Sequence, residues 1–193
     1  MNKRLTRSVA IVAALFAFAG MAAFFGEARA ENGQPDVIFV PTPQVVVDKM
    51  LETARVTKSD LIYDLGCGDG RIVVTAAKRY GAHAIGFDID PQRIRSSQEN
   101  VRTNGVDNLV QIRQADIFQL DLTPANVVTL YLLPSLNIKL MPQLKRLRAG
   151  SRIVSHDFDM QGAKPKRIVR LMDGGEYPRE HTIFYWEVPW EEQ

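Results

Sequence analysis

The chain has 193 residues, of which 46% are hydrophobic and 8% aromatic. This length suits one domain, and the apolar share is too high for an intrinsically disordered chain. A single cysteine, Cys67, excludes an intramolecular disulfide and any zinc or iron–sulfur site built from several cysteines. Residues 1–30 carry a net charge of +3, whereas residues 31–193 carry 20 basic and 21 acidic side chains. No basic run remains in the body of the chain, which argues against a nucleic-acid partner held by bulk electrostatics.

Residues 1–30 have the pattern of an export signal. Residues 1–8 are basic, and the run Val9–Phe25 that follows is uncharged and apolar. Ala28-Arg29-Ala30 then places small residues at positions −3 and −1 of a cleavage site, so we expect a secretory signal peptide that is cut after Ala30. The alternatives are an uncleaved membrane anchor, because the run is long for a signal and short for a span, and a buried first helix. The signal predicts a periplasmic or secreted domain, and the anchor also places the domain outside the cytoplasm.

Residues 31–193 are predicted to form one domain in which strands and helices alternate. Thr42-Pro43 offers a threonine N-cap and a proline at the first helical position, and Asp90-Pro91 offers a second cap. Pro142 is expected to kink or break the fourth helix. The predicted helices cover residues 45–55, 71–80, 91–104 and 135–147, and the predicted strands cover residues 61–65, 84–88, 110–113, 127–133, 152–155, 168–172 and 182–188. The alternation predicts an α/β sandwich with a mostly parallel sheet covered on both faces.

A glycine-rich turn joins the first strand to the second helix. Asp64-Leu65-Gly66-Cys67-Gly68-Asp69-Gly70 allows tight turning and close approach of a ligand to the backbone. A dinucleotide fingerprint would need glycine at position 71, where Arg71 stands, and this disfavours a dinucleotide-dependent redox enzyme. The Gly-Lys-Ser/Thr end of a phosphate-binding P-loop is also absent. The acidic residue at the strand end is placed to hold a cationic or amino-bearing ligand.

Two further carboxylates follow the next two strands. Asp88 ends the second strand, 22 residues after Gly66, where a carboxylate can accept hydrogen bonds from two ribose hydroxyls. Asp116-Ile117 follows the third strand and can offer a carboxylate to an adenine amine and an apolar group to its ring. Each of these aspartates could instead be a strand-end cap. Because ligands in such folds bind outside the carboxyl ends of the strands, all three features are expected at one site.

These segments resemble a known family. The chain is similar to class I S-adenosylmethionine-dependent methyltransferases, and within them to the archaeal broad-specificity protein-lysine methyltransferase and its mitochondrial relatives. The resemblance spans about residues 37–188 and is carried by Val40-Pro41-Thr42-Pro43, Tyr63–Arg71, Val127–Pro134 and Arg152–Phe158.

The resemblance implies a single Rossmann-like domain with a seven-stranded, mostly parallel sheet, an antiparallel last strand and S-adenosylmethionine as cofactor. The expected acceptor is the lysine amine of a protein partner, and a small-molecule acceptor or a non-catalytic S-adenosylmethionine binder are the alternatives. Those relatives act where the cofactor is made or imported, so the expected export of this chain is a departure from the family. The residues expected to hold the cofactor are Asp64, Gly66, Gly68, Gly70, Asp88, Asp116 and Ile117.

Methyl transfer to lysine also requires a positioned acceptor that has lost its proton. Tyr131, His156 and Asp157, at the ends of the fourth and fifth strands, are the catalytic candidates. Each could instead have a packing, hydrogen-bonding or capping role. His83 and His181 are expected to be structural. No set of His, Asp and Glu has the sequence spacing of metal ligands, so no metal is expected.

Overall fold

The computed structural model describes residues 39–193. The predicted leader, residues 1–30, lies outside these described residues. The elements in chain order are α1 (Gln44–Thr53), β1 (Leu61–Leu65), α2 (Arg71–Tyr80), β2 (His83–Asp88), α3 (Pro91–Thr103), β3 (Val110–Gln114), the short 3₁₀ helix η1 (Ile117–Gln119), β4 (Val127–Leu130), α4 (Pro134–Leu144), β5 (Arg152–His156), β6 (Arg167–Met172) and β7 (Glu180–Glu187).

The seven strands form one sheet in the order β3-β2-β1-β4-β5-β7-β6. All neighbours from β3 to β5 pair in parallel, and β7 runs antiparallel to both β5 and β6. The predicted α/β sandwich with a mostly parallel, seven-stranded sheet and an antiparallel last strand is therefore confirmed. Chain order reverses direction across the β1–β4 pair, which is where parallel sheets of this type open a crevice at their carboxyl edge.

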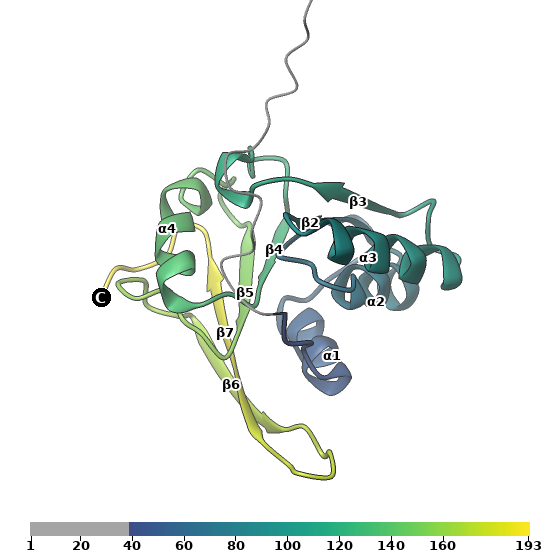
Figure 1. Ribbon diagram of the computed structural model, residues 1–193. Coiled ribbons are helices and arrows are strands. Elements are labelled where there is room, and N and C mark those ends of the chain that lie inside the picture. The colour runs from purple at the N-terminus through teal and green to yellow at the C-terminus, as the bar shows by residue number, and fades with distance from the viewer. Residues whose placement is uncertain (1–38) are drawn as a thin grey trace, which may run out of the picture.

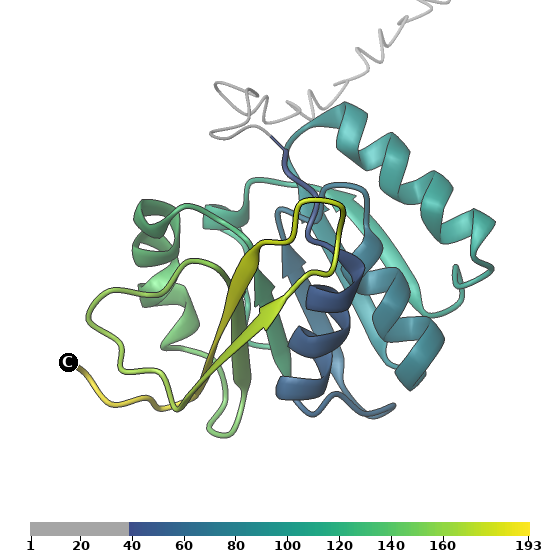
Figure 2. The same ribbon diagram turned by 90° about the horizontal axis from the view of Figure 1, so that it is seen from below.

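Helices cover the two faces of the sheet unequally. The first three helices lie on one face and α4 lies on the other, so the sheet is a middle layer (Figures 1 and 2). One core cluster joins α1 and α2 to the sheet through residues such as Val47, Met50 and Val73, and the other joins α4 through Leu140 and Leu144. The central strand β4 is buried along its whole length, as a parallel strand covered on both faces must be.

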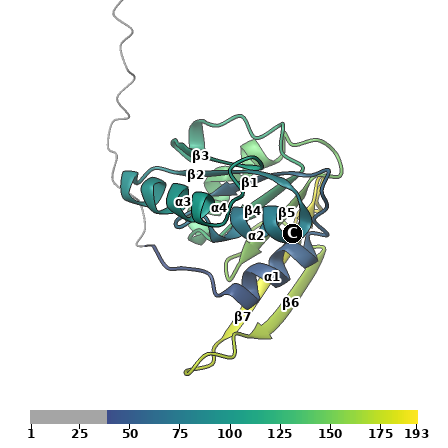
Figure 3. The ribbon, with the colours of Figure 1, turned by 90° about the vertical axis from the view of Figure 1, so that its right-hand side faces the viewer.

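The β6–β7 hairpin extends beyond the body of the molecule (Figure 3). In β6 the burial alternates only weakly, whereas β7 is buried at every second residue and then at Tyr185 and Trp186. The hairpin therefore has a base that is packed into the core and a tip that is exposed to solvent. Among residues 39–193, no helix is both long enough and apolar enough to cross a membrane.

Most predicted element bounds agree with the structure to within two residues, and three features differ more clearly. Strand β4 ends at Leu130 instead of residue 133, because the chain turns away and Pro134 begins α4 at a position that suits proline. Helix α4 continues through Pro142 and ends at Leu144, so a break at Pro142 is wrong, and the alternative of a kink there stays a prediction. Thr42 does not cap α1: Pro43 is the N-cap, and the Thr42 hydroxyl is instead hydrogen-bonded to His156.

Candidate active site

A cavity of about 610 Å³ lies at the carboxyl ends of the central strands. It is lined by the β1–α2 turn, the residues after β2 and β3, and the β4–α4 connection. The predicted cofactor residues that line it are Asp64, Gly66, Asp88, Asp116 and Ile117, and Tyr131 lines it as well. The parallel register thus brings together segments that lie more than sixty residues apart in the chain.

The glycine turn folds tightly against the end of β2. The backbone N–H groups of Gly66 and Cys67 both donate to the carbonyl of Phe87, at 2.9 and 2.8 Å. Gly68 has a positive φ of +56°, and a Cβ added to it would lie 2.0 Å from the ring of Phe39. Glycine is therefore required here both by backbone conformation and by close contact.

Asp64 has an unpaired carboxylate oxygen inside the protein. Its Oδ1 accepts a hydrogen bond of 2.6 Å from the Thr129 hydroxyl, while its Oδ2 is buried and has no hydrogen-bond partner. Burial raises the pKa of Asp64 to about 7, and the nearby Asp88 and Asp69 carboxylates add to the rise, whereas the Thr129 hydrogen bond opposes it. A buried, unpaired acceptor at a cavity wall needs a donor, preferably a cationic one. The α-amino group of S-adenosylmethionine fits this requirement.

Asp88 and Asp116 each combine a capping role with a place on the cavity wall. Asp88 accepts from the backbone N–H of Gly68 at 2.9 Å and from that of Asp90 at 3.0 Å. Asp116 caps η1 by accepting from the N–H of Phe118 at 2.9 Å. The capping alternative is therefore observed for both residues, and it leaves the cofactor role open, because each carboxylate oxygen has a second lone pair that can receive a ligand hydroxyl or amine.

Two side chains that the sequence did not single out, Phe39 and Arg93, also line the cavity. The guanidinium of Arg93 lies over the Phe39 ring, 4.7 Å from its centroid. Arg71 is held by Asp69, with Nη2–Oδ2 at 2.6 Å, and it donates to the carbonyl of Thr42 at 2.8 Å. Arg71, which excluded the dinucleotide fingerprint, thus ties the entry segment to the glycine turn.

Tyr131 forms the boundary between the cavity and a buried polar cluster. It lines the cavity, and its ring centroid lies 3.9 Å from that of His156 at an interplanar angle of 34°. Phe158 stacks against its ring at a centroid distance of 6.0 Å. Tyr131 can therefore contact a ligand in the cavity, while the His156 ring packs against the Tyr131 ring.

His156 is fully buried and both of its ring nitrogens are engaged. Nδ1 lies 3.2 Å from the Thr42 hydroxyl, and Nε2 lies 2.8 Å from Nδ1 of His181. Burial lowers the pKa of His156 to about 4, and the Asp157 carboxylate partly opposes that fall, while His181 and Arg179 add to it. His156 is consequently neutral at ordinary pH. It contacts a cavity residue, Thr42, without lining the cavity itself.

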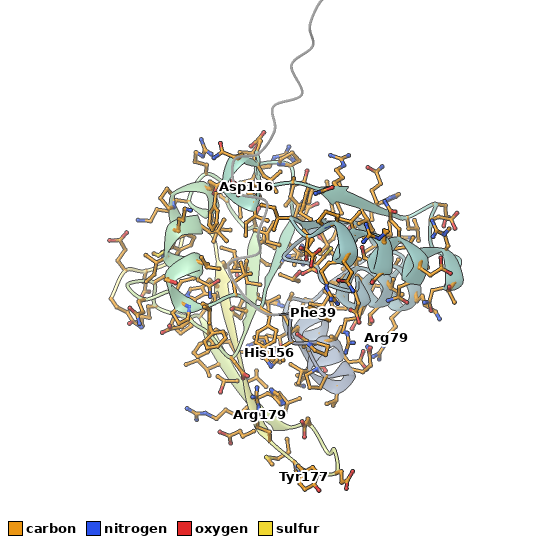
Figure 4. All side chains as sticks on the ribbon, in the orientation of Figure 1. Phe39, Arg79, Asp116, His156, Tyr177 and Arg179 are labelled. Atoms are coloured by element: carbon orange, nitrogen blue, oxygen red, sulfur yellow. The ribbon has the colours of Figure 1, made fainter. Side chains whose placement is uncertain are left out.

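Asp157 holds together the ends of β5 and β7. It has a positive φ of +58°, which is uncommon for a non-glycine residue. Its Oδ1 accepts from the backbone N–H of Thr182 at 2.9 Å, and its Oδ2 lies 2.5 Å from Arg179. In Figure 4, Arg179 lies beyond His156 on the hairpin, on the side away from Asp116. Gly68, Gly70, His156 and Asp157 are the predicted site residues that the cavity wall does not include, and their catalytic or binding roles stay predictions.

The fold also brings together a set of side chains that the sequence spacing did not indicate. His156, Asp157 and His181 each offer one possible metal-ligand atom, and these three atoms lie within 4.8 Å of one another. The sequence spacing did not indicate this group of possible metal ligands, but the structure contains it. His181, expected to be merely structural, is buried in this cluster. The antiparallel pairing of β5 with β7 brings these three residues together, and no local sequence motif predicts that pairing.

The strand order, the cavity at the switch point and the unpaired Asp64 oxygen together define a Rossmann-like S-adenosylmethionine-dependent methyltransferase. Comparisons with known proteins agree. A family model described as the ANTKMT methyltransferase domain matches residues 64–167. The chain belongs to this methyltransferase family.

Three relatives give the range of similarity. A protein-lysine N-methyltransferase of Saccharolobus islandicus is 42% identical over 156 residues, covering 80% of this chain and 95% of that protein. A human lysine N-methyltransferase, named for its action on ATP synthase, is 25% identical over 131 residues, 67% of this chain and 55% of that protein. A solved structure titled as an RNA methyltransferase from Salinibacter ruber in complex with S-adenosyl-L-homocysteine is 48% identical, with a TM-score of 0.72, covering 78% of this chain and 94% of that one. S-adenosylmethionine is the cofactor of this enzyme.

Proposed function

We propose that this enzyme transfers the methyl group of S-adenosylmethionine to the side-chain amine of a lysine in a protein partner. The observation that carries the proposal is the 42% identity to a protein-lysine N-methyltransferase along nearly the whole of that protein. Asp64, Asp88 and Asp116 would hold the amino, ribose and adenine parts of the cofactor. The cofactor would supply a methyl carbon bonded to a sulfonium sulfur, and the lysine nitrogen forms its bond to that carbon as the carbon–sulfur bond breaks and the thioether leaves.

The cavity supports a lysine acceptor through its apolar wall. The β4–α4 connection lines the cavity with Leu132, Leu133 and Leu136, and Phe158 lies beside them. Such side chains suit the aliphatic stem of lysine. Deprotonating lysine at pH 7 costs about 4–5 kcal/mol, because its ordinary pKa is about 10.4. An apolar wall reduces this cost, since burial disfavours the ammonium form.

The Salinibacter ruber structure is described as an RNA methyltransferase, which raises RNA as a second acceptor class. The charge of this chain favours protein, because residues 31–193 carry 20 basic and 21 acidic side chains and so offer no net positive charge to a phosphate backbone.

The purified full-length chain, incubated with isotope-labelled S-adenosylmethionine and a cell extract of its source, separates these acceptors. We expect the label in protein, surviving ribonuclease and lost when the lysines of the extract are acetylated beforehand. Label that stays in RNA after protease treatment would assign an RNA acceptor, and label in small molecules would assign that class instead. Cofactor binding without any transfer would assign a non-catalytic binder.

We further propose that the enzyme is exported, with residues 1–30 as a signal peptide cut after Ala30 or, if uncut, as a membrane anchor. The basic start, the apolar run and the small residues before the cut support this proposal. N-terminal sequencing of the protein recovered from fractionated cells tests it. A first residue of Glu31 in the periplasmic or secreted fraction is expected for the signal, and an intact chain in the cytoplasm would contradict both export readings.

A further inference from the structure

Four side chains form a continuous line of hydrogen bonds next to the cavity. The Thr42 hydroxyl lies 3.2 Å from Nδ1 of His156, Nε2 of His156 lies 2.8 Å from Nδ1 of His181, and Nε2 of His181 lies 3.3 Å from Oδ2 of Asp173. The residues come from the segment before α1, the end of β5, the start of β7 and the residue after β6. They are far apart in the sequence and are brought together by the sheet.

With one proton on each imidazole ring, the line has one consistent direction of donation. Asp173 already accepts hydrogen bonds from the backbone N–H groups of Arg179 and Gly175, and these bonds, together with His181, lower its pKa, so it is an ionised acceptor. Nε2 of His181 must then donate, which leaves its Nδ1 free to accept from Nε2 of His156. Nδ1 of His156 in turn accepts from the Thr42 hydroxyl. Every ring nitrogen therefore has a matching partner with both histidines neutral.

The two ends of the line lie in different environments. Thr42 is on the cavity wall, and His156 and His181 are buried, with 0% and 3% of their side chains exposed. Asp173 lies at the start of the hairpin loop with 18% of its side chain exposed. The line thus joins a residue of the cavity wall to a solvent-accessible carboxylate, which is the requirement for moving a proton away from the acceptor.

We propose that Thr42, His156, His181 and Asp173 form a proton relay that removes the proton from the acceptor amine before methyl transfer. The proposal rests on the lysine acceptor proposed above. The ammonium N–H bond breaks as Thr42 Oγ1 takes the proton, and the former Thr42 proton passes to Nδ1 of His156. The Nε2 proton of His156 passes to Nδ1 of His181, and the Nε2 proton of His181 passes to Oδ2 of Asp173, which releases it to water. One proton enters and one leaves, and the amine keeps the lone pair that attacks the methyl group.

The groups around the histidines favour a relay over a metal site. Nε2 of His156 and Nδ1 of His181 each lie 3.4 Å from Oδ2 of Asp157, a spacing that a divalent ion could use. Nη2 of Arg179 already lies 2.5 Å from that oxygen and 3.4 Å from Nδ1 of His181, so a cation is present at this position. Tyr131 covers the other side of the His156 ring.

The test compares Asp173→Asn with the wild-type chain from pH 7 to pH 9, with label incorporation into extract protein as the rate. Asparagine keeps one oxygen for the two backbone N–H groups but cannot take up the proton. We expect a rate about ten- to a hundredfold lower at pH 7, with unchanged affinity for S-adenosylmethionine. The loss should shrink at least tenfold by pH 9, because more acceptor amine then arrives already deprotonated. His181→Gln should show the same pH pattern.

Asp121→Asn is the matched control, because Asp121 also accepts from a backbone N–H in a turn but contacts no histidine. It should behave as wild type. A loss in Asp173→Asn that is the same at every pH, or no loss, would overturn the relay while leaving lysine methylation intact. One bound metal ion per chain that is needed for the rate would overturn it as well. No label in protein with the wild-type chain would instead contradict the proposed function.

Discussion

At the residue scale, the unpaired oxygen of Asp64 predicts how cofactor binding depends on pH. Its pKa of about 7 means that the free protein holds this carboxyl largely protonated at pH 6. A cationic amine binds the ionised form, so binding must release a proton, and affinity should rise with pH up to about 7. Below that pH the limiting change is about tenfold in Kd per pH unit. In the free protein the same raised pKa lowers the free energy of unfolding as pH rises from about 4 to about 7.

Calorimetric titration with S-adenosylmethionine at pH 6, in two buffers with different heats of ionisation, measures the released protons directly. We expect between half a proton and one proton per site for the wild-type chain, an order-of-magnitude consequence of the linkage. Asp64→Asn should bind more weakly and release none. Equal proton release by both proteins would remove Asp64 from the amino-group site.

Gly68 offers a second test at this scale, with Gly105 as its matched control. Both have positive φ, +56° and +63°, so alanine at either position costs about 1–2 kcal/mol in stability. A Cβ at Gly68 would lie 2.0 Å from the Phe39 ring, whereas a Cβ at Gly105 would meet nothing within 4 Å.

Gly68→Ala should therefore displace Phe39 and weaken S-adenosylmethionine binding at least tenfold, while Gly105→Ala should leave the affinity unchanged. Both variants should show a similar loss in chemical denaturation. If the two bind the cofactor equally well, the contact between Phe39 and the glycine turn does not shape the site.

At the scale of elements, one partly buried ion pair joins the start of β5 to the chain before β1. Arg152 is paired with Asp60, and their side chains are 18% and 7% exposed. Arg152 also donates to the carbonyls of Ala54 and Arg55, at 2.9 and 3.1 Å, where α1 ends. The residue therefore satisfies three acceptors from segments that precede β1 and ties them to β5.

Arg152→Met should lower the free energy of unfolding by about 2–3 kcal/mol, because it leaves Oδ1 of Asp60 and two carbonyls without their donor, while Oδ2 of Asp60 keeps its hydrogen bonds from Thr57. Lys164→Met is the control: its partner is Glu191, and the two side chains are 59% and 76% exposed. That substitution should leave unfolding unchanged within error. Urea denaturation measures the free energy of unfolding of both variants. Equally small decreases in the two would show that the Arg152 contacts add no net stability.

Sequence patterns predicted the elements well where the signal is local. Helix caps, buried apolar strands and the glycine turn each depend on only a few neighbouring residues. Asp90 is an example, because it caps α3 as expected. The predicted break at Pro142 did not occur. Pro142 lies near the end of α4, and the helix continues for two more residues. The predicted Thr42 cap did not form, because the Thr42 hydroxyl is hydrogen-bonded to His156, which is distant in the sequence.

At the scale of the whole molecule, the meeting of three aspartates at one cavity was predictable and the polar cluster was not. Asp64, Asp88 and Asp116 each lie at or just after the end of a strand, so the parallel order alone places them at one edge. His181 and Asp173 reach the site only because β7 pairs antiparallel with β5 and β6. That pairing depends on tertiary packing, which the spacing of residues in the sequence does not predict.

The central claim is methyl transfer to the amine of lysine, and the most direct measurement locates the methyl group. The wild-type chain and the Asp64→Asn variant are incubated separately with S-adenosylmethionine carrying a deuterated methyl group and with extract protein, and the proteins are digested for tandem mass spectrometry. We predict deuterated methyl groups on lysine Nζ with the wild-type chain and a strong reduction with the variant. Label on any other protein atom, or only on RNA, would contradict the account.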